Sequence, residues 1–117
     1  MHTIKESDWK IKESDWKLFK PLRAMALARY CERTIGDVQS IASNHAKTAH
    51  ERYCEIFQLL QKRDHELQQT FDYLRRSTAL NQLVAFRVTE LVTDEELLPF
   101  SAEVREFIQS VVALRRS

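Results

Sequence analysis

Hydrophobic residues recur at helical spacing in four segments of the chain. In the first segment they follow one another at steps of four, four, three and four: Leu27, Cys31, Ile35, Val38 and Ala42. These steps place them on one stripe of an α-helix. Pro21 has a fixed backbone angle and no N–H, which suits the first position of a helix, so the pattern predicts a helix over residues 22–42 that ends at Ser43 and Asn44.

The second segment is the longest and runs from Lys47 to Leu74. Its stripe comprises Ala49, Tyr53, Ile56, Leu60, Leu67, Phe71 and Leu74, with Arg63 in the turn that lacks a hydrophobic residue. One unbroken helix of this length spans about 42 Å at 1.5 Å per residue, whereas a compact domain of this size has a radius of gyration of about 13–14 Å. We therefore expect either a break near Arg63 and Asp64 or an elongated molecule.

The third segment, residues 79–91, is hydrophobic around most of its circumference, which is typical of a central, buried helix. Ser77 or Thr78 is placed to cap its start. Thr93 and Glu96 match a capping box, which predicts a short helical turn that Pro99 ends.

The fourth segment carries a stripe that comprises Val104, Phe107, Ile108, Val111 and Val112. Ser101 is placed to cap this last helix, and Arg115 and Arg116 suit its carboxyl end because cations are favourable there.

Turn-forming residues are scarce between these segments. The chain has one glycine, Gly36, and two prolines, Pro21 and Pro99, and residues 37–98 contain neither type. A β protein needs such residues far more often. The pattern therefore predicts an all-α fold, bundle-like with four main helices, elongated if the second segment is a single helix, and with a short N-terminal turn.

The heptapeptide IKESDWK occurs twice, at residues 4–10 and 11–17. We expect Ser14 to cap a short turn through residues 15–17 that ends before Pro21, so that the second copy belongs to the fold. The first copy is either a linear motif that docks a partner through its tryptophan or a surplus duplication. The second alternative is favoured because chain termini tolerate additions. The predicted organisation is a flexible extension over residues 1–13 and a single helical domain over 14–117.

Composition limits the classes of function. Hydrophobic residues make up 44% of the chain and charged residues 30%, so we expect a hydrophobic core with a charged surface. The net charge is +1, so we expect no overall attraction to nucleic acid or to anionic membranes. The charged N-terminus lacks the apolar run of a signal peptide, and the most apolar stretch, residues 79–92, is too short for a membrane span. Two cysteines, Cys31 and Cys54, are too few for a disulfide framework and indicate a cytoplasmic protein.

Residues with catalytic or metal-binding potential are present but match no known motif. His50 and Cys54 lie one helical turn apart, near His45 and Glu51, yet no second ligand pair with zinc-site spacing follows. We expect Cys31 and Cys54 to be inert thiols buried on apolar stripes. Asp94, Glu95 and Glu96 occupy a helix start, where carboxylates are stabilising for ordinary electrostatic reasons. One glycine cannot form a phosphate-binding loop, which excludes the P-loop and dinucleotide-binding fingerprints. Because none of these residues matches a catalytic or metal-binding motif, we expect no enzyme, metal or cofactor.

The most distinctive polar cluster is formed by Arg75, Arg76 and Ser77, followed by Thr78. Two guanidinium groups before a helix start could bind an anion or a partner, and the spacing also fits a basic-directed phosphorylation motif. The favoured alternative is a capped turn whose arginines pair with Asp72 or face water. The first helix region also has a basic bias, which comes from Lys17, Lys20, Arg23, Arg29 and Arg33. The aromatic residues Trp16, Phe19 and Tyr30 are interleaved with them.

Several short stretches look like a family of small bacterial all-helical proteins to which no function is assigned. They are AHERY at residues 49–53, the pair Arg63 and Asp64, RRSTA at 75–79 and LPFS at 98–101. The resemblance covers most of the chain after residue 14 and implies a bacterial, cytoplasmic, helical protein. The doubled heptapeptide departs from the family pattern.

These observations predict a non-enzymatic cytoplasmic protein that self-associates or binds a protein partner, since a long amphipathic helix needs a partner wherever it extends beyond the core. The alternative is weak binding of nucleic acid or another anion through Arg75, Arg76 and the basic first helix.

Overall fold

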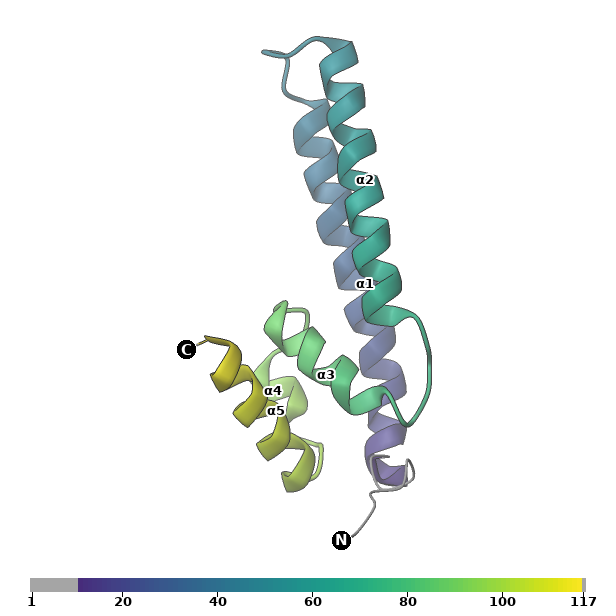
Figure 1. The fold of residues 1–117 in the computed structure, drawn as a ribbon, viewed down its shortest axis with the longest axis vertical. Helices are drawn as coiled ribbons and strands as arrows, with labels where there is room; N and C mark the ends of the chain where they lie inside the picture. The colour runs from purple at the N-terminus through teal and green to yellow at the C-terminus, as the bar shows by residue number, and fades with distance from the viewer. Residues whose placement is uncertain (1–10, 117) are drawn as a thin grey trace, which may run out of the picture. The chain divides into compact units, whose positions relative to one another are not determined.

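The structure, a computed structural model, describes residues 11–116, which form five α-helices and no strand (Figure 1). The helices are α1 (Glu13–Ala42), α2 (Ala49–Phe71), α3 (Ala79–Val88), α4 (Asp94–Leu97) and α5 (Ala102–Arg116). The all-α prediction with four main helices is therefore confirmed, and α4 is the predicted single turn. By its internal contacts the chain divides into two compact units, and α1 contributes to both. Unit 1 combines the described part of Met1–Ala26 with that of Tyr73–Ser117, and unit 2 is Leu27–Asp72.

The start of the first helix differs from the prediction. Pro21 lies inside α1, which begins eight residues earlier at Glu13, so the predicted short turn after Ser14 is wrong. Proline removes the hydrogen bond to the carbonyl of Lys17, and this normally disfavours a helix interior. Here Pro21 and Lys17 are both exposed, so water can satisfy that carbonyl, while Phe19 and Leu22 are buried on the opposite side. Burial of these side chains outweighs the unfavourable proline.

The core of unit 1 forms around α3, which contacts α5. Leu83 and Phe86 of α3 are fully buried, and the ring of Phe86 stacks on that of Phe19 with 6.2 Å between centroids. Val104 and Ile108 of α5 are also buried in this unit. The prediction of a buried helix after residue 79 is thus confirmed for unit 1.

The helix α3 ends three residues earlier than predicted because the chain reverses at Glu90. This residue has φ of 60°, the left-handed conformation that usually falls to glycine. The N–H of Leu91 donates to Phe86 O at 2.8 Å and that of Glu90 to Arg87 O at 3.1 Å, the two bonds of a Schellman motif. Leu91 is buried beside the motif. The sequence offered no glycine to mark this helix end.

Capping side chains define the starts of the short helices. Thr93 accepts from the N–H of Glu96 while Glu96 accepts from the N–H of Thr93, which confirms the predicted capping box of α4. Ser101 Oγ accepts from the N–H of Val104, which confirms the predicted cap of α5. Thr78 precedes α3 as expected, but its hydroxyl donates to backbone carbonyls and does not cap the helix.

The second heptapeptide copy is tied into unit 1. Asp15 is 2% exposed, and its carboxylate accepts from the N–H and from the hydroxyl of Ser101, each at 2.8 Å. Ile11 is buried, and its carbonyl accepts from Arg76 Nε at 2.6 Å. The first copy, residues 4–10, lies outside the described residues. The predicted boundary at residues 13 and 14 falls inside this contact network.

Unit 2 is a hairpin in which the second part of α1 and the whole of α2 run antiparallel, side by side (Figure 1). α1 ends at Ala42, as predicted from Ser43 and Asn44. Thr48 and Glu51 form a capping box at the start of α2, which was not among the predicted caps. α2 continues without a break through Arg63 and Asp64, so the predicted alternative of a break there is wrong.

Candidate functional site

A polar cluster fixes the register of α2 against α1 within the hairpin. The hydroxyl of Tyr30, shared between two acceptors, donates to Arg63 O at 2.8 Å and to Glu66 Oε2 at 3.0 Å. The guanidinium of Arg63 donates to Asp37 Oδ2 at 2.7 Å and to Thr34 Oγ1 at 3.2 Å. Arg63 thus takes the one turn where the apolar stripe is interrupted and bonds across to α1. These part-buried polar contacts favour one pairing of the two helices.

Tyr30 is the most perturbed acid of the cluster. Its burial, with smaller contributions from the hydrogen bond and the charge of Glu66, raises the pKa of Tyr30 to about 12. Burial disfavours the phenolate, and a neighbouring carboxylate repels it. Tyr30 therefore stays neutral at physiological pH and acts as a hydrogen-bond donor that joins the helices.

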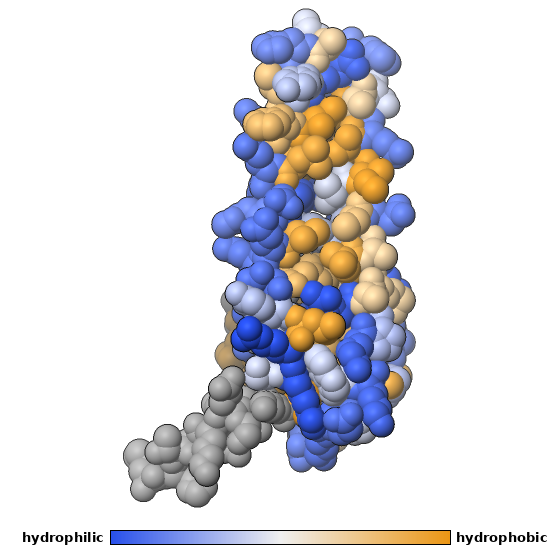
Figure 2. Space-filling view, turned by 90° about the vertical axis from the view of Figure 1, so that its right-hand side faces the viewer, coloured by the Kyte–Doolittle hydropathy of each residue, from blue (hydrophilic) through white to orange (hydrophobic). Residues whose placement is uncertain are grey.

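One face of the hairpin is apolar and uncovered. Within Leu27–Asp72, a range that the structure describes throughout, only Tyr30 and Phe71 are buried. Large hydrophobic side chains on this unit are instead between 46% and 68% exposed: Ile35, Tyr53, Phe57 and Leu60. Figure 2 shows hydrophobic side chains gathered along one face of the hairpin between hydrophilic flanks. We call this surface the apolar face.

The exposed residues of α2 follow coiled-coil spacing. Tyr53, Phe57, Leu60, Asp64 and Leu67 succeed one another at steps of four, three, four and three. This alternation keeps a seam on one side of a helix, and it is typical of helices that pack against another helix. Asp64 is the single polar residue in this series, and its carboxylate accepts from Gln68 Nε2 at 3.1 Å.

A groove of about 280 Å³ opens on the same face between the two helices. Its lining comprises Tyr30, Cys31, Thr34 and Ile35 from α1, and Leu60, Arg63, Asp64 and Leu67 from α2, and most of the surface that these residues present to the groove is apolar. The groove is thus mainly apolar, which suits a hydrophobic side chain better than a polar ligand. Both cysteines were predicted to be buried, but Cys31 and Cys54 are free and only half-buried, and Cys31 lines the groove.

The predicted anion or partner contact lies in unit 1, just before α3. Arg76 is engaged within the unit, since its guanidinium donates to Ile11 O and to Glu13 Oε2. Arg75 is exposed, and its guanidinium lies over the ring of Tyr73 at 4.4 Å. Ser77 is half-buried. The predicted pairing of these arginines with Asp72 is not among their contacts, and binding of an anion or nucleic acid here stays a prediction.

The basic side chains of the first helix do not form one recognised site. Lys20 Nζ lies 5.5 Å from the ring centre of Trp16, and Lys17 is exposed. Arg23, Arg29 and Arg33 each have an interaction partner. Base stacking on Trp16 would therefore compete with Lys20.

The histidine and cysteine pair on α2 is real but isolated. His50 Nε2 lies 3.6 Å from Cys54 Sγ. Across residues 11–116, no three side chains of His, Cys, Asp or Glu gather in a way that could hold a metal ion. The arrangement is the one expected of two residues one helical turn apart.

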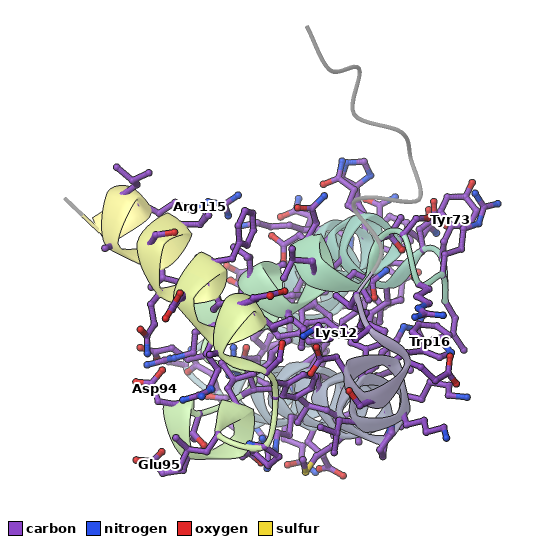
Figure 3. All side chains as sticks on the ribbon, turned by 90° about the horizontal axis from the view of Figure 1, so that it is seen from below. Lys12, Trp16, Tyr73, Asp94, Glu95 and Arg115 are labelled. Atoms are coloured by element: carbon purple, nitrogen blue, oxygen red, sulfur yellow. The ribbon has the colours of Figure 1, made fainter. Side chains whose placement is uncertain are left out.

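The carboxylates at the start of α4 serve the fold. Asp94 accepts from Arg87 Nε at 2.7 Å and from Arg87 Nη2 at 3.2 Å, and this contact raises the pKa of Arg87 further. Figure 3 shows the labelled side chains of Trp16, Asp94 and Arg115 spread around the edge of unit 1, pointing away from one another. A second cavity of about 310 Å³ is lined in part by Arg87 and Asp94. These two side chains are already bonded to each other.

Comparison with known protein families, curated proteins and solved structures found no match for this chain. The resemblance to a bacterial helical family therefore stays a prediction. In the part of the chain that the structure describes, no helix has both the length and the hydropathy needed to cross a membrane. The apolar face is accordingly the feature on which a function can be argued.

The spacing that marks this face is present in the sequence, but it is not the stripe predicted for this segment. The predicted stripe combined Ile56, which is half-buried, with Tyr53 and Leu60, which are exposed, and it omitted Phe57. Steps of three and four along one helix are compatible both with the stripe through Ile56 and with the seam through Phe57. Only the position of α1 shows which seam is covered.

Proposed function

We propose that this protein is a non-enzymatic interaction protein that self-associates through the apolar face of its hairpin. The observation that carries the proposal is the exposure of Ile35, Tyr53, Phe57 and Leu60 on a unit with only two buried residues. Exposed apolar surface that is contiguous and bordered by polar residues typically marks a protein interface. A hairpin of two helices leaves one of its apolar faces exposed to water. When two hairpins pack face to face, they form a four-helix bundle in which these faces are buried.

The size of the face fits a second copy of the chain. α2 has 23 residues, which span about 35 Å at 1.5 Å per residue. Within the hairpin α1 contributes Leu27–Ala42, which spans about 24 Å, so two helices each about 10 Å wide give a face of about 600 Å². Stable interfaces bury from about 600 Å² on each partner, so one matching hairpin is sufficient to cover it.

The composition of the face also favours self-association. Its central residues, Phe57 and Leu60 on α2 and Ile35 on α1, are uncharged, so two copies can meet without placing like charges at the centre. A two-fold interface needs a self-complementary surface, and an apolar one meets this condition readily. The two free cysteines are consistent with a reducing compartment, and we place the protein in the cytoplasm as part of the proposal.

Size-exclusion chromatography with light scattering tests the proposal. At micromolar concentration we expect a mass twice that of the 13.8 kDa chain. Leu60→Asp puts a charge at the centre of the face and should give a monomer, since an unpaired buried charge is strongly unfavourable at an interface. Leu60 is already 46% exposed, so the hairpin itself should tolerate the change.

The matched control is Leu114→Asp, because Leu114 is 76% exposed on unit 1. This variant should have the mass of the wild-type assembly. A strictly monomeric wild-type protein across micromolar concentrations would contradict the proposal.

A further inference from the structure

The two ends of the apolar face have complementary shapes. The groove includes Leu60 and Leu67 among its α2 residues, while the exposed aromatic side chains Tyr53 and Phe57 lie on the same seam, nearer the start of α2. Tyr53 and Phe57 are 68% and 53% exposed, and the groove has a volume of about 280 Å³. The face thus carries projecting side chains at one height and a hollow at another.

We propose that the second copy docks antiparallel, with the two-fold axis crossing α2 at Leu60, so that Phe57 and Tyr53 of each copy enter the groove of the other. This inference rests on the proposed self-association and adds its geometry. About an axis at residue 60, position 57 meets position 63 and position 53 meets position 67. Both aromatic side chains are then level with the groove, and Leu60 meets its own copy.

A parallel dimer lacks this fit. Its two-fold axis runs along the helices, so equal heights meet: the aromatic side chains face the partner's aromatic height, and each groove faces the partner's groove. The antiparallel arrangement also places α2 on the partner's α2 and α1 on the partner's α1, each pair antiparallel. Every neighbouring helix pair is then antiparallel, as in simple up-and-down four-helix bundles. A two-fold axis along the helices gives the same topology, because α2 then faces the partner's α1, so the fit of the aromatic side chains to the groove decides the orientation.

The polar residue of the seam also fits this arrangement. Asp64 lies one position beyond residue 63, which meets Phe57 of the other copy, and it is exposed at the edge of the groove. Its carboxylate is held by Gln68 and can stay at the rim in contact with water. Phe57 of the other copy lies at the height of Arg63, which also lines the groove, but the guanidinium of Arg63 is already bonded to Asp37 and Thr34. The ring therefore covers a charge that is paired within the hairpin.

Truncation of the projecting side chain is the first test. Phe57→Ala should weaken the dimer at least about 30-fold, the loss typical of a central aromatic anchor. Tyr73→Ala is the control, since Tyr73 is an aromatic residue of unit 1 with similar exposure, 51%. It should leave the dissociation constant within about twofold of wild type. Helical content by circular dichroism shows that both variants are folded.

Distances between spin labels test the orientation. Labels are attached through a non-canonical amino acid at Gln58 or Gln69, which leaves both native cysteines in place. These positions are 11 residues apart, about three turns, so they lie on the same side of α2, away from the seam. About an axis at residue 60, the two labels of a dimer are offset along the helix by about 6 Å at position 58 and about 27 Å at position 69.

The antiparallel arrangement therefore predicts a clearly longer distance at position 69 than at position 58. Equal distances at both positions would indicate a parallel dimer and overturn the inference, as would an unchanged dissociation constant for Phe57→Ala. These outcomes require a dimer, so they are distinct from failure of the proposed function. A monomeric wild-type protein, by contrast, would overturn both.

Discussion

Asp15→Ala should be the most informative single change in unit 1. The carboxylate of Asp15 is buried and accepts two hydrogen bonds from Ser101, at the start of α5. Hydrogen bonds to a charged group contribute about 1.5–3 kcal/mol each to stability. The substitution also removes the unfavourable free energy of burying the carboxylate, and this gain offsets part of the loss. We therefore expect a net loss of about 3 kcal/mol in the free energy of unfolding.

The repeated heptapeptide supplies an internal control for this change. Asp8 occupies the same place in the first copy as Asp15 in the second. Asp8→Ala should leave stability unchanged if the first copy is surplus to the fold, and so should deletion of residues 4–10. The two aspartate variants have the same composition, so any difference between them reports position alone.

Urea and thermal unfolding followed by circular dichroism measure the effect. A loss of 3 kcal/mol corresponds to a decrease in Tm of about 12 °C, at about 4 °C per kcal/mol for a domain of this size. Protein concentration must be equal in all samples, because self-association adds to apparent stability. If Asp15→Ala and Asp8→Ala differ by less than about 0.5 kcal/mol, the contact with Ser101 does not stabilise unit 1 as reasoned here.

Three further changes follow from single residues. Gly36→Ala should raise the free energy of unfolding by about 1 kcal/mol, because Gly36 lies inside α1 and an added Cβ meets no atom within 4 Å; thermal unfolding at fixed concentration checks this, and a decrease would contradict it. Glu90→Gly should add about 0.5–1 kcal/mol by relieving the left-handed backbone, less the lost attraction to Arg87; no gain in the urea midpoint would show that the strain is negligible. In a spectrophotometric titration Tyr30 should ionise near pH 12; since its pKa is raised from 10.0 on folding, its stabilising effect is complete below pH 10 and is lost as pH rises toward 12. Tyr30→Phe should abolish that late step, and a titration unchanged by this substitution would assign the step elsewhere.

The parts of the fold that rest on local chemistry could be predicted from the sequence. The capping box of Thr93 and Glu96, the cap at Ser101 and the helix end at Ser43 each depend on neighbouring residues, and each is confirmed. The longer-range decisions could not be predicted. Pro21 is a helix starter by local preference, and only the burial of Phe19 beside it explains why α1 runs through.

The candidate site was beyond sequence reasoning for a related reason. Arg63 reads as a gap in an apolar stripe, and its bonds to Asp37 and Thr34 appear only when the hairpin has closed. Tyr53 and Leu60 read as core residues, because a period of 3.6 shows that they share a face but not whether another element covers it. Local pattern therefore identified the helices, and tertiary pairing decided which face remained available.

The order in which the two units occur along the chain has a consequence for synthesis. Unit 2 is one continuous stretch, Leu27–Asp72, whereas unit 1 joins the first part of α1 to residues that follow Tyr73. At about 5–20 residues per second, the ribosome needs roughly 2–7 s to add the residues from Tyr73 to Ile108, which is buried in unit 1. At the start of that interval the hairpin has all its residues, while Phe19 still lacks Phe86 of α3, on which its ring stacks. Nascent hairpins on neighbouring ribosomes could therefore pair before unit 1 is complete, and the assembly would begin on the polysome.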